Sequence, residues 1–151
     1  MSFPEVTADD FARRFAMRGD KLMWLLGAGA SASAGIPTAG DMIWDFKQQL
    51  YITQRRVAPE TVRDLTNPAV RAQLQSFIEA NGNYPAPGHV DEYAALFEAA
   101  YPNERDRRTY IDAKISRGKP SYGHLAMATL MRARRLNLVW TTNFDTLIAD
   151  A

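Results

Sequence analysis

The sequence predicts an α/β fold in which a parallel sheet is interrupted by a long helical insertion. Two apolar runs of strand length, 21–26 and 136–142, support this prediction. Neither run alternates apolar with polar residues, which is typical of strands covered on both faces in a parallel sheet. Almost everything between the two runs has helical spacing, so the insertion is expected to extend from about 41 to 133.

Caps and periodicity place the helices. Thr7 followed by Asp10 matches a capping box and predicts a first helix that ends near Gly19. After Pro37 the apolar residues recur near 3.6-residue spacing, and Asp41 occupies the favourable N-terminal turn. Further helices are expected at 59–65, 68–80, 91–100, 103–116 and 121–133, with a short one from about 145. Two strands make an incomplete sheet, so we expect the 151 residues to be the N-terminal part of a single domain that continues beyond Ala151.

Composition excludes several classes of function. The chain has no cysteine, so disulfides, thiolate zinc sites and a cysteine nucleophile are excluded within it, and no metal is expected in this segment. A net charge of +1 offers no global attraction for nucleic acid or anionic membranes. No apolar run approaches the roughly 20 residues of a membrane span, and the start lacks a signal-peptide pattern. We therefore expect a cytoplasmic protein.

Some isolated residues have plain structural interpretations. Two arginine clusters, 105–108 and 132–135, are expected on solvated helix faces rather than against nucleic acid. The tryptophans at 24, 44 and 140 are expected in the core, since two of them lie in predicted strands. His124 is expected to be a packed helix residue with a local hydrogen bond.

A glycine-rich loop follows the first predicted strand. Gly27, Gly29 and Ala32 match the dinucleotide-binding fingerprint, in which small residues let the backbone approach a pyrophosphate near a helix start. The alternative is that the glycines only form a tight turn. A Walker-type phosphate loop is excluded because no lysine lies between Lys21 and Lys47. A hydride-transferring dehydrogenase is disfavoured, because the acidic residues about 20 positions downstream lie on a predicted helix. Because the glycine loop follows a strand and precedes a helix, the sheet is nevertheless expected to be Rossmann-like.

Three short motifs, taken together, resemble the sirtuin family. They are Gly27-Ala28-Gly29-Ala30-Ser31, Gly35-Ile36-Pro37 and Thr141-Thr142-Asn143-Phe144-Asp145, and the segment from Lys119 to His124 resembles the one that precedes the second strand in that family. Two features depart from deacylase sirtuins: Thr38-Ala39-Gly40 stands where they have Asp-Phe-Arg, and Thr142 stands where they have Gln. The chain is in this respect more similar to sirtuin-like NADases of bacterial antiphage defence systems.

The resemblance implies roles for individual residues. NAD would be the substrate, and Asn143 would be catalytic, while Asp145 would hold the nicotinamide carboxamide. The pocket would be lined by Gly27, Ala28, Gly29, Ala30, Ser31, Ile36, Pro37 and Thr142. The chemistry is compatible, because nicotinamide leaves as a neutral group and needs no acid, while an asparagine amide can orient a water.

The resemblance also implies what lies outside this segment. The family's histidine base and a further cofactor-binding segment follow the second strand at a distance, so we expect this segment alone to be inactive. Activating partners would be Argonaute-like, helicase-like or phage proteins, and a homo-oligomer is expected. Three alternatives stay open: an NAD or ADP-ribose sensor without turnover, a protein deacylase, and a strand-end turn in which Asn143 and Asp145 only cap a helix.

Overall fold

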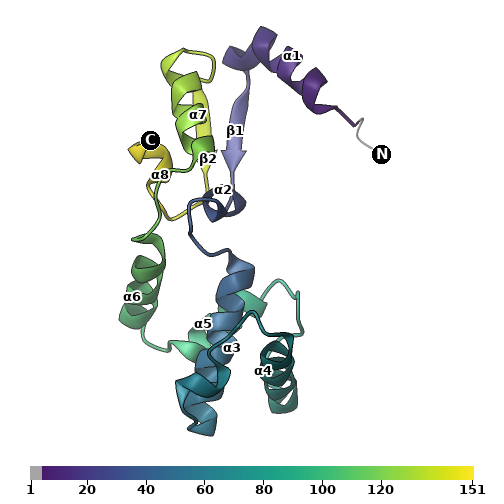
Figure 1. Cartoon of the computed structure of the whole chain (residues 1–151), viewed down its shortest axis with the longest axis vertical. Coiled ribbons are helices and arrows are strands. Elements are labelled where there is room, and N and C mark those ends of the chain that lie inside the picture. Colours follow the sequence, from purple (N-terminus) through teal and green to yellow (C-terminus); the bar gives the residue numbers. More distant parts are fainter. Residues whose placement is uncertain (1–4) are drawn as a thin grey trace. The chain divides into compact units, whose positions relative to one another are not determined.

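A computed structural model describes residues 5–151, and it has an α/β fold that is mostly helical (Figure 1). The chain divides into two compact units. The first unit combines the two ends of the chain, 1–36 and 118–151, and the second is the helical stretch from Pro37 to Arg117. The sequence predicted an insertion of about 41–133; the observed helical unit ends earlier, because the helix at 122–132 belongs with the strands.

The first unit is built on two parallel strands, as predicted. β1 (Met23–Leu26) pairs with β2 (Leu138–Thr141), with Leu26 opposite Thr141 in the register. The other elements of this unit are α1 (Ala8–Arg18), the 3₁₀ turn η1 (Gly19–Lys21), α2 (Gly29–Ala32), α7 (Tyr122–Arg132) and α8 (Leu147–Asp150). Thr7 Oγ1 accepts the N–H of Asp10 at 3.2 Å, which confirms Thr7 as the N-cap of α1; the reciprocal bond from Asp10, which the predicted capping box requires, is not found among the described residues.

The sheet is covered on one face. Trp24 lies on that face and makes edge contacts with the rings of Phe11 and Phe15 from α1. The side chains that point to the other face are largely exposed: Leu25 is 72% exposed and Trp140 59%. The prediction that both strands are covered on both faces is therefore wrong for the described residues, and so is the core assignment of Trp140. An apolar run shows that a strand can be buried, but it does not show which segment covers each face.

The second unit is an all-helical bundle. Its elements are α3 (Ala39–Arg55), the 3₁₀ turn η2 (Pro59–Val62), α4 (Pro68–Asn81), α5 (Glu92–Ala100) and α6 (Glu104–Ile115). The predicted helix at 59–65 is only the turn η2, whereas the other helices agree with their predicted positions to within a few residues. The core forms around Phe46, whose ring packs against those of Tyr93, Phe97, Tyr101 and Tyr110.

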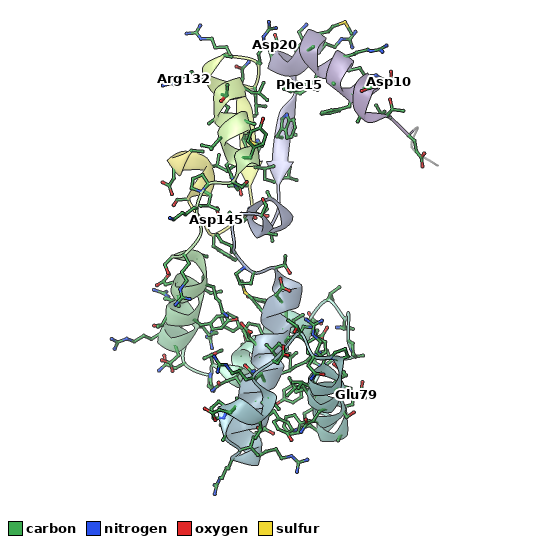
Figure 2. All side chains as sticks on the ribbon, in the orientation of Figure 1. Asp10, Phe15, Asp20, Glu79, Arg132 and Asp145 are labelled. Carbon is green, nitrogen blue, oxygen red and sulfur yellow. The ribbon has the colours of Figure 1, made fainter. Side chains whose placement is uncertain are left out.

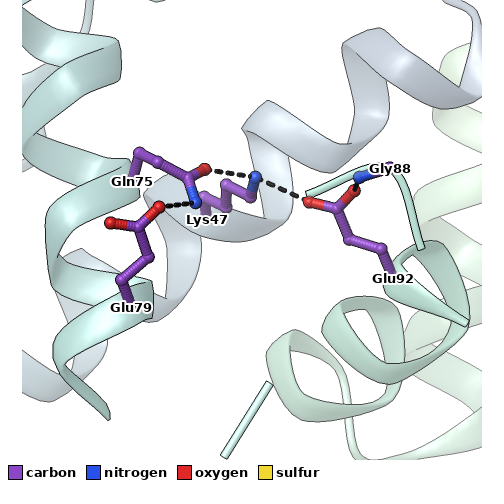
Figure 3. A network of polar contacts seen from close by, with 5 residues as sticks. All are labelled: Lys47, Gln75, Glu79, Gly88 and Glu92. Carbon is purple, nitrogen blue, oxygen red and sulfur yellow. Dashed lines mark hydrogen bonds and ion pairs between the residues drawn. The ribbon is translucent and has the colours of Figure 1, made fainter. Parts of the chain in front are cut away.

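Two polar features stabilise α3. Thr38 and Asp41 form a reciprocal capping box at its start, and the hydrogen bonds from Thr38 lower the pKa of the Asp41 carboxyl. Further along, Lys47 is buried and its Nζ donates to Glu92 Oε1 at 2.8 Å and to Gln75 Oε1 at 2.7 Å (Figure 3). The Gly88 N–H donates to the second oxygen of Glu92 at 2.7 Å, so the buried carboxylate is bonded at both oxygens.

Candidate functional site

The carboxyl ends of β1 and β2 bring two distant segments to one edge of the sheet. Because the strands are parallel, both chains leave the sheet at the same edge. The glycine loop, 27–31, follows β1, and residues 142–145 follow β2. The Thr142 N–H donates to the Leu26 carbonyl at 3.1 Å, which extends the strand pairing by one bond and holds the two exits together.

Ser31 joins these two segments. Its side chain is 1% exposed, and its Oγ donates to Asp145 Oδ2 at 2.7 Å. The same oxygen accepts a hydrogen bond from Asn143 Nδ2 at 2.9 Å. We call these three residues the Ser31 network; Asp145 is labelled in Figure 2. All three were singled out from the sequence, but their direct contact was not predicted.

The network determines how the Asn143 amide is oriented. A serine hydroxyl carries one proton, and here that proton is donated to the Asp145 carboxylate. The hydroxyl oxygen can then only accept, so the Asn143 NH₂ group must face it. The amide oxygen of Asn143 is left buried and without a hydrogen-bond partner among residues 5–151. A buried acceptor without a partner costs about 1–3 kcal/mol, so it marks a place where a donor from a bound molecule would be stabilising.

Asp145 has a structural role as well. Its Oδ1 accepts the Leu147 N–H at 3.1 Å, which caps the short helix α8. The interpretation of this residue as a helix cap therefore holds for one of its oxygens. A carboxylate has about four lone-pair positions, so two accepted hydrogen bonds leave capacity for a ligand donor.

The glycines of the loop are not explained by backbone conformation. Neither Gly27 nor Gly29 has a positive φ, and a Cβ added to either would meet no atom within 4 Å. Gly35, which follows the loop, has a φ of +84° and needs glycine for its conformation. The tight-turn interpretation thus fits Gly35 and not the first two, whose bare backbone leaves room for a molecule to approach.

The helix after the loop is shorter than the fingerprint requires. α2 is a single turn, and the N–H groups of Ala30 and Ser31 are already bonded to the carbonyls of Gly27 and Ala28. The long helix α3 begins only at Ala39. A single turn has a small dipole, so anion binding by a following helix, which the sequence suggested, has little support here.

The remaining predicted site residues are divided between the units. Ile36 is buried, and its N–H donates to the Ser31 carbonyl at 3.3 Å, so it packs against the loop. Pro37 is the first residue of the second unit. Ala28 and Thr142 are exposed, and Ala30 is half-buried.

His124 was correctly predicted as a packed helix residue. It is 4% exposed, and its Nδ1 accepts the Ser121 N–H at 3.1 Å as the second half of a capping box on α7. A signal for this contact exists in the sequence, because histidine stands three residues after a serine at a helix start. Within residues 5–151, no histidine is bonded to Asn143 or Asp145.

Two further observations limit the chemistry. No group of three His, Cys, Asp or Glu residues in the described part of the chain is arranged to hold a metal ion. None of the helices in residues 5–151 is both long and apolar enough to cross a membrane. A scan against models of known protein families and a search of curated proteins each gave no match to this chain.

Proposed function

We propose that this chain binds NAD at the edge where β1 and β2 end, and that its native form hydrolyses the bond between ribose and nicotinamide. In this proposal the sheet is the first part of a Rossmann-like, sirtuin-like nucleotide-binding domain. The observation that carries the proposal is the Ser31 network, which joins the glycine loop to Asn143 and leaves the buried amide oxygen of Asn143 without a hydrogen-bond partner among the described residues.

The unpaired amide oxygen of Asn143 suits the task of orienting the nucleophile of such a reaction. In hydrolysis the bond between the ribose anomeric carbon and the ring nitrogen breaks, and its electron pair stays on nicotinamide, which leaves uncharged. A water oxygen then bonds to the anomeric carbon, and one proton of that water is released to the solvent. An amide oxygen accepts a hydrogen bond from that water or from a ribose hydroxyl without adding charge, so it orients the nucleophile.

Asp145 and the loop supply binding. A carboxylate with lone pairs to spare can accept the N–H groups of a carboxamide. The bare backbone at Gly27 and Gly29 leaves space for a pyrophosphate, because no side chain covers it. By the resemblance, an activating protein of a defence system and a homo-oligomeric state belong to the same proposal.

A sensor that binds NAD or an ADP-ribose derivative without turnover is the second candidate. Among the described residues no histidine contacts the Ser31 network, and both candidates expect this of the present segment. His124 is engaged with Ser121, and His89 Nδ1 accepts the N–H of Asp91. Binding without a base would still use the loop and Asp145.

The test is nicotinamide release from NAD, followed by chromatography, with the longest native form that contains this chain. We expect Asn143→Ala to lower the rate by about 10²-fold or more, the range for a side chain that positions or activates a nucleophile. Asn137→Ala is the matched control, since Asn137 is an exposed asparagine of the same unit whose side chain donates to the Asp20 carbonyl at 3.1 Å.

The outcomes separate the two candidates. Release by the native form and Asn137→Ala, with loss in Asn143→Ala, supports hydrolysis. If no form releases nicotinamide while NAD or ADP-ribose raises the melting temperature, the sensor is the better account. If NAD neither turns over nor changes the melting temperature, both candidates fail.

A further inference from the structure

The amide oxygen of Asn143 is withdrawn from solvent in the described chain. Its Oδ1 is fully buried and accepts no hydrogen bond from residues 5–151. The residues on either side are open, because Thr142 is exposed and the Phe144 side chain is 80% exposed. A ligand at this edge of the sheet therefore meets the neighbours of Asn143 but not the oxygen that would orient the nucleophile.

A single side-chain hydrogen bond holds the amide in this position. Asn143 Nδ2 donates to Ser31 Oγ at 2.9 Å, and this is the one hydrogen bond of that side chain among the described residues. The backbone N–H of Asn143 bonds elsewhere, to Thr141 Oγ1 at 3.0 Å. The side chain can therefore turn to another staggered rotamer while the backbone at the strand exit keeps its place.

Ser31 acts on this amide and is not itself open to a ligand. It is 1% exposed, so in this state NAD has almost no surface of Ser31 to contact. Its one hydroxyl proton is donated to Asp145 Oδ2 at 2.7 Å, and it cannot also be donated to the Asn143 oxygen. Asp145 thus keeps Ser31 an acceptor, and the oxygen of Asn143 has no partner among residues 5–151 while the amide remains there.

Two opposing effects act on the buried position of the amide. The hydrogen bond to Ser31 favours it, whereas a buried acceptor without a partner disfavours it by at least as much as one neutral hydrogen bond contributes. When the side chain turns out, water can satisfy both ends of the amide. A side chain whose two positions differ little in free energy can be shifted by a ligand that binds only one of them.

From these observations we propose that Ser31 is a positioning residue that holds Asn143 at rest, and that NAD binds with the Asn143 amide turned out of this contact. The inference rests on the proposed function and adds a step to it. The bond between Asn143 and Ser31 has to break before the amide oxygen reaches a water or a ribose hydroxyl, so the contact is autoinhibitory. Removing the Ser31 hydroxyl should therefore destabilise the chain and yet strengthen its binding of NAD.

The first measurement is made on the full chain without ligand. The ¹H–¹⁵N signals of the Asn143 side-chain NH₂ group, identified by their loss in Asn143→Ala, are followed while a neutral gadolinium chelate is added as a probe of solvent contact. In Ser31→Ala we expect the chelate to broaden these signals at least about two-fold more than in the native chain, because the resting position is lost. Ser33→Ala is the matched control and should behave like the native chain, since Ser33 is exposed.

The second measurement titrates NAD into the same chains. If the resting position is populated at least half of the time, its loss should tighten the binding of NAD by Ser31→Ala at least about two-fold relative to Ser33→Ala. In the native chain the Asn143 NH₂ protons should show a nuclear Overhauser contact to the Hβ protons of Ser31. Saturation with NAD should abolish this contact, and this readout needs no variant.

The outcomes separate this inference from the proposed function. Loss of the contact to Ser31 on NAD binding, with tighter binding by Ser31→Ala, supports it. It is overturned alone if NAD binds while the contact persists, if Ser31→Ala binds NAD no more tightly than Ser33→Ala, or if the chelate broadens the Asn143 signals equally in Ser31→Ala and the native chain. If NAD binds none of the chains, the proposed function fails and this inference with it. If Ser31→Ala does not fold, the contact in the native chain decides.

Discussion

Replacing Ser31 by alanine tests whether the Ser31 network forms in solution. The substitution removes two hydrogen bonds of a hydroxyl that is almost fully buried. The bond to the Asp145 carboxylate is of the charged kind, worth about 1.5–3 kcal/mol, and the bond from Asn143 is neutral, worth about 0.5–1.5 kcal/mol. We therefore expect Ser31→Ala to lower the free energy of unfolding by about 2–4 kcal/mol.

The assay is urea unfolding followed by tryptophan fluorescence, where a lower midpoint with an unchanged slope reports a change in stability. Ser33→Ala is the control, because Ser33 is exposed and lies two residues after Ser31. Asp145→Asn, alone and combined with Ser31→Ala, completes a double-mutant cycle, and residues in one network should couple by about 0.5–3 kcal/mol. A loss for Ser31→Ala no larger than that for Ser33→Ala, together with additive effects in the cycle, would refute the network.

Three further predictions concern the buried ion pair and the glycines. Lys47→Met should lower the free energy of unfolding by about 3–5 kcal/mol in chemical denaturation, because it leaves the buried Glu92 carboxylate without its counter-charge; a loss below 1 kcal/mol would contradict the burial of the pair. Burial by itself raises the pKa of Glu92, but the hydrogen bonds from Lys47 and the Gly88 N–H outweigh it and hold that pKa below the ordinary 4.5. This stabilisation is present above pH 4.5 and is lost as the pH falls below that value. In Glu92→Gln the free energy of unfolding should therefore fall less steeply as the pH drops below 4.5, and an unchanged pH dependence would contradict this prediction. Gly35→Ala should cost about 1 kcal/mol or more because of its positive φ, whereas Gly29→Ala should be neutral or slightly stabilising in thermal unfolding yet weaken NAD binding; equal losses of stability in both would show that the loop glycines serve the backbone alone.

Local patterns in the sequence were sufficient for most of the helices and for both strands. Thr7 predicted the start of α1, Asp41 the first turn of α3, and the apolar runs the positions of β1 and β2. These features depend on neighbours three or four residues away or on one strand's own composition, so they are readable along the chain. The same locality explains the correct interpretation of His124, whose partner is three residues away.

Contacts between distant residues were decided only by the tertiary structure. Ser31 meets Asn143 and Asp145 across more than 100 residues, and no spacing rule predicts which hydroxyl faces which amide. The pairing of Lys47 with Glu92 has the same origin. Sequence patterns describe what each segment can bury, whereas the fold decides which segments meet. The fold therefore also decides which polar atoms find partners and which, such as the amide oxygen of Asn143 and Nε2 of His124, have none among residues 5–151.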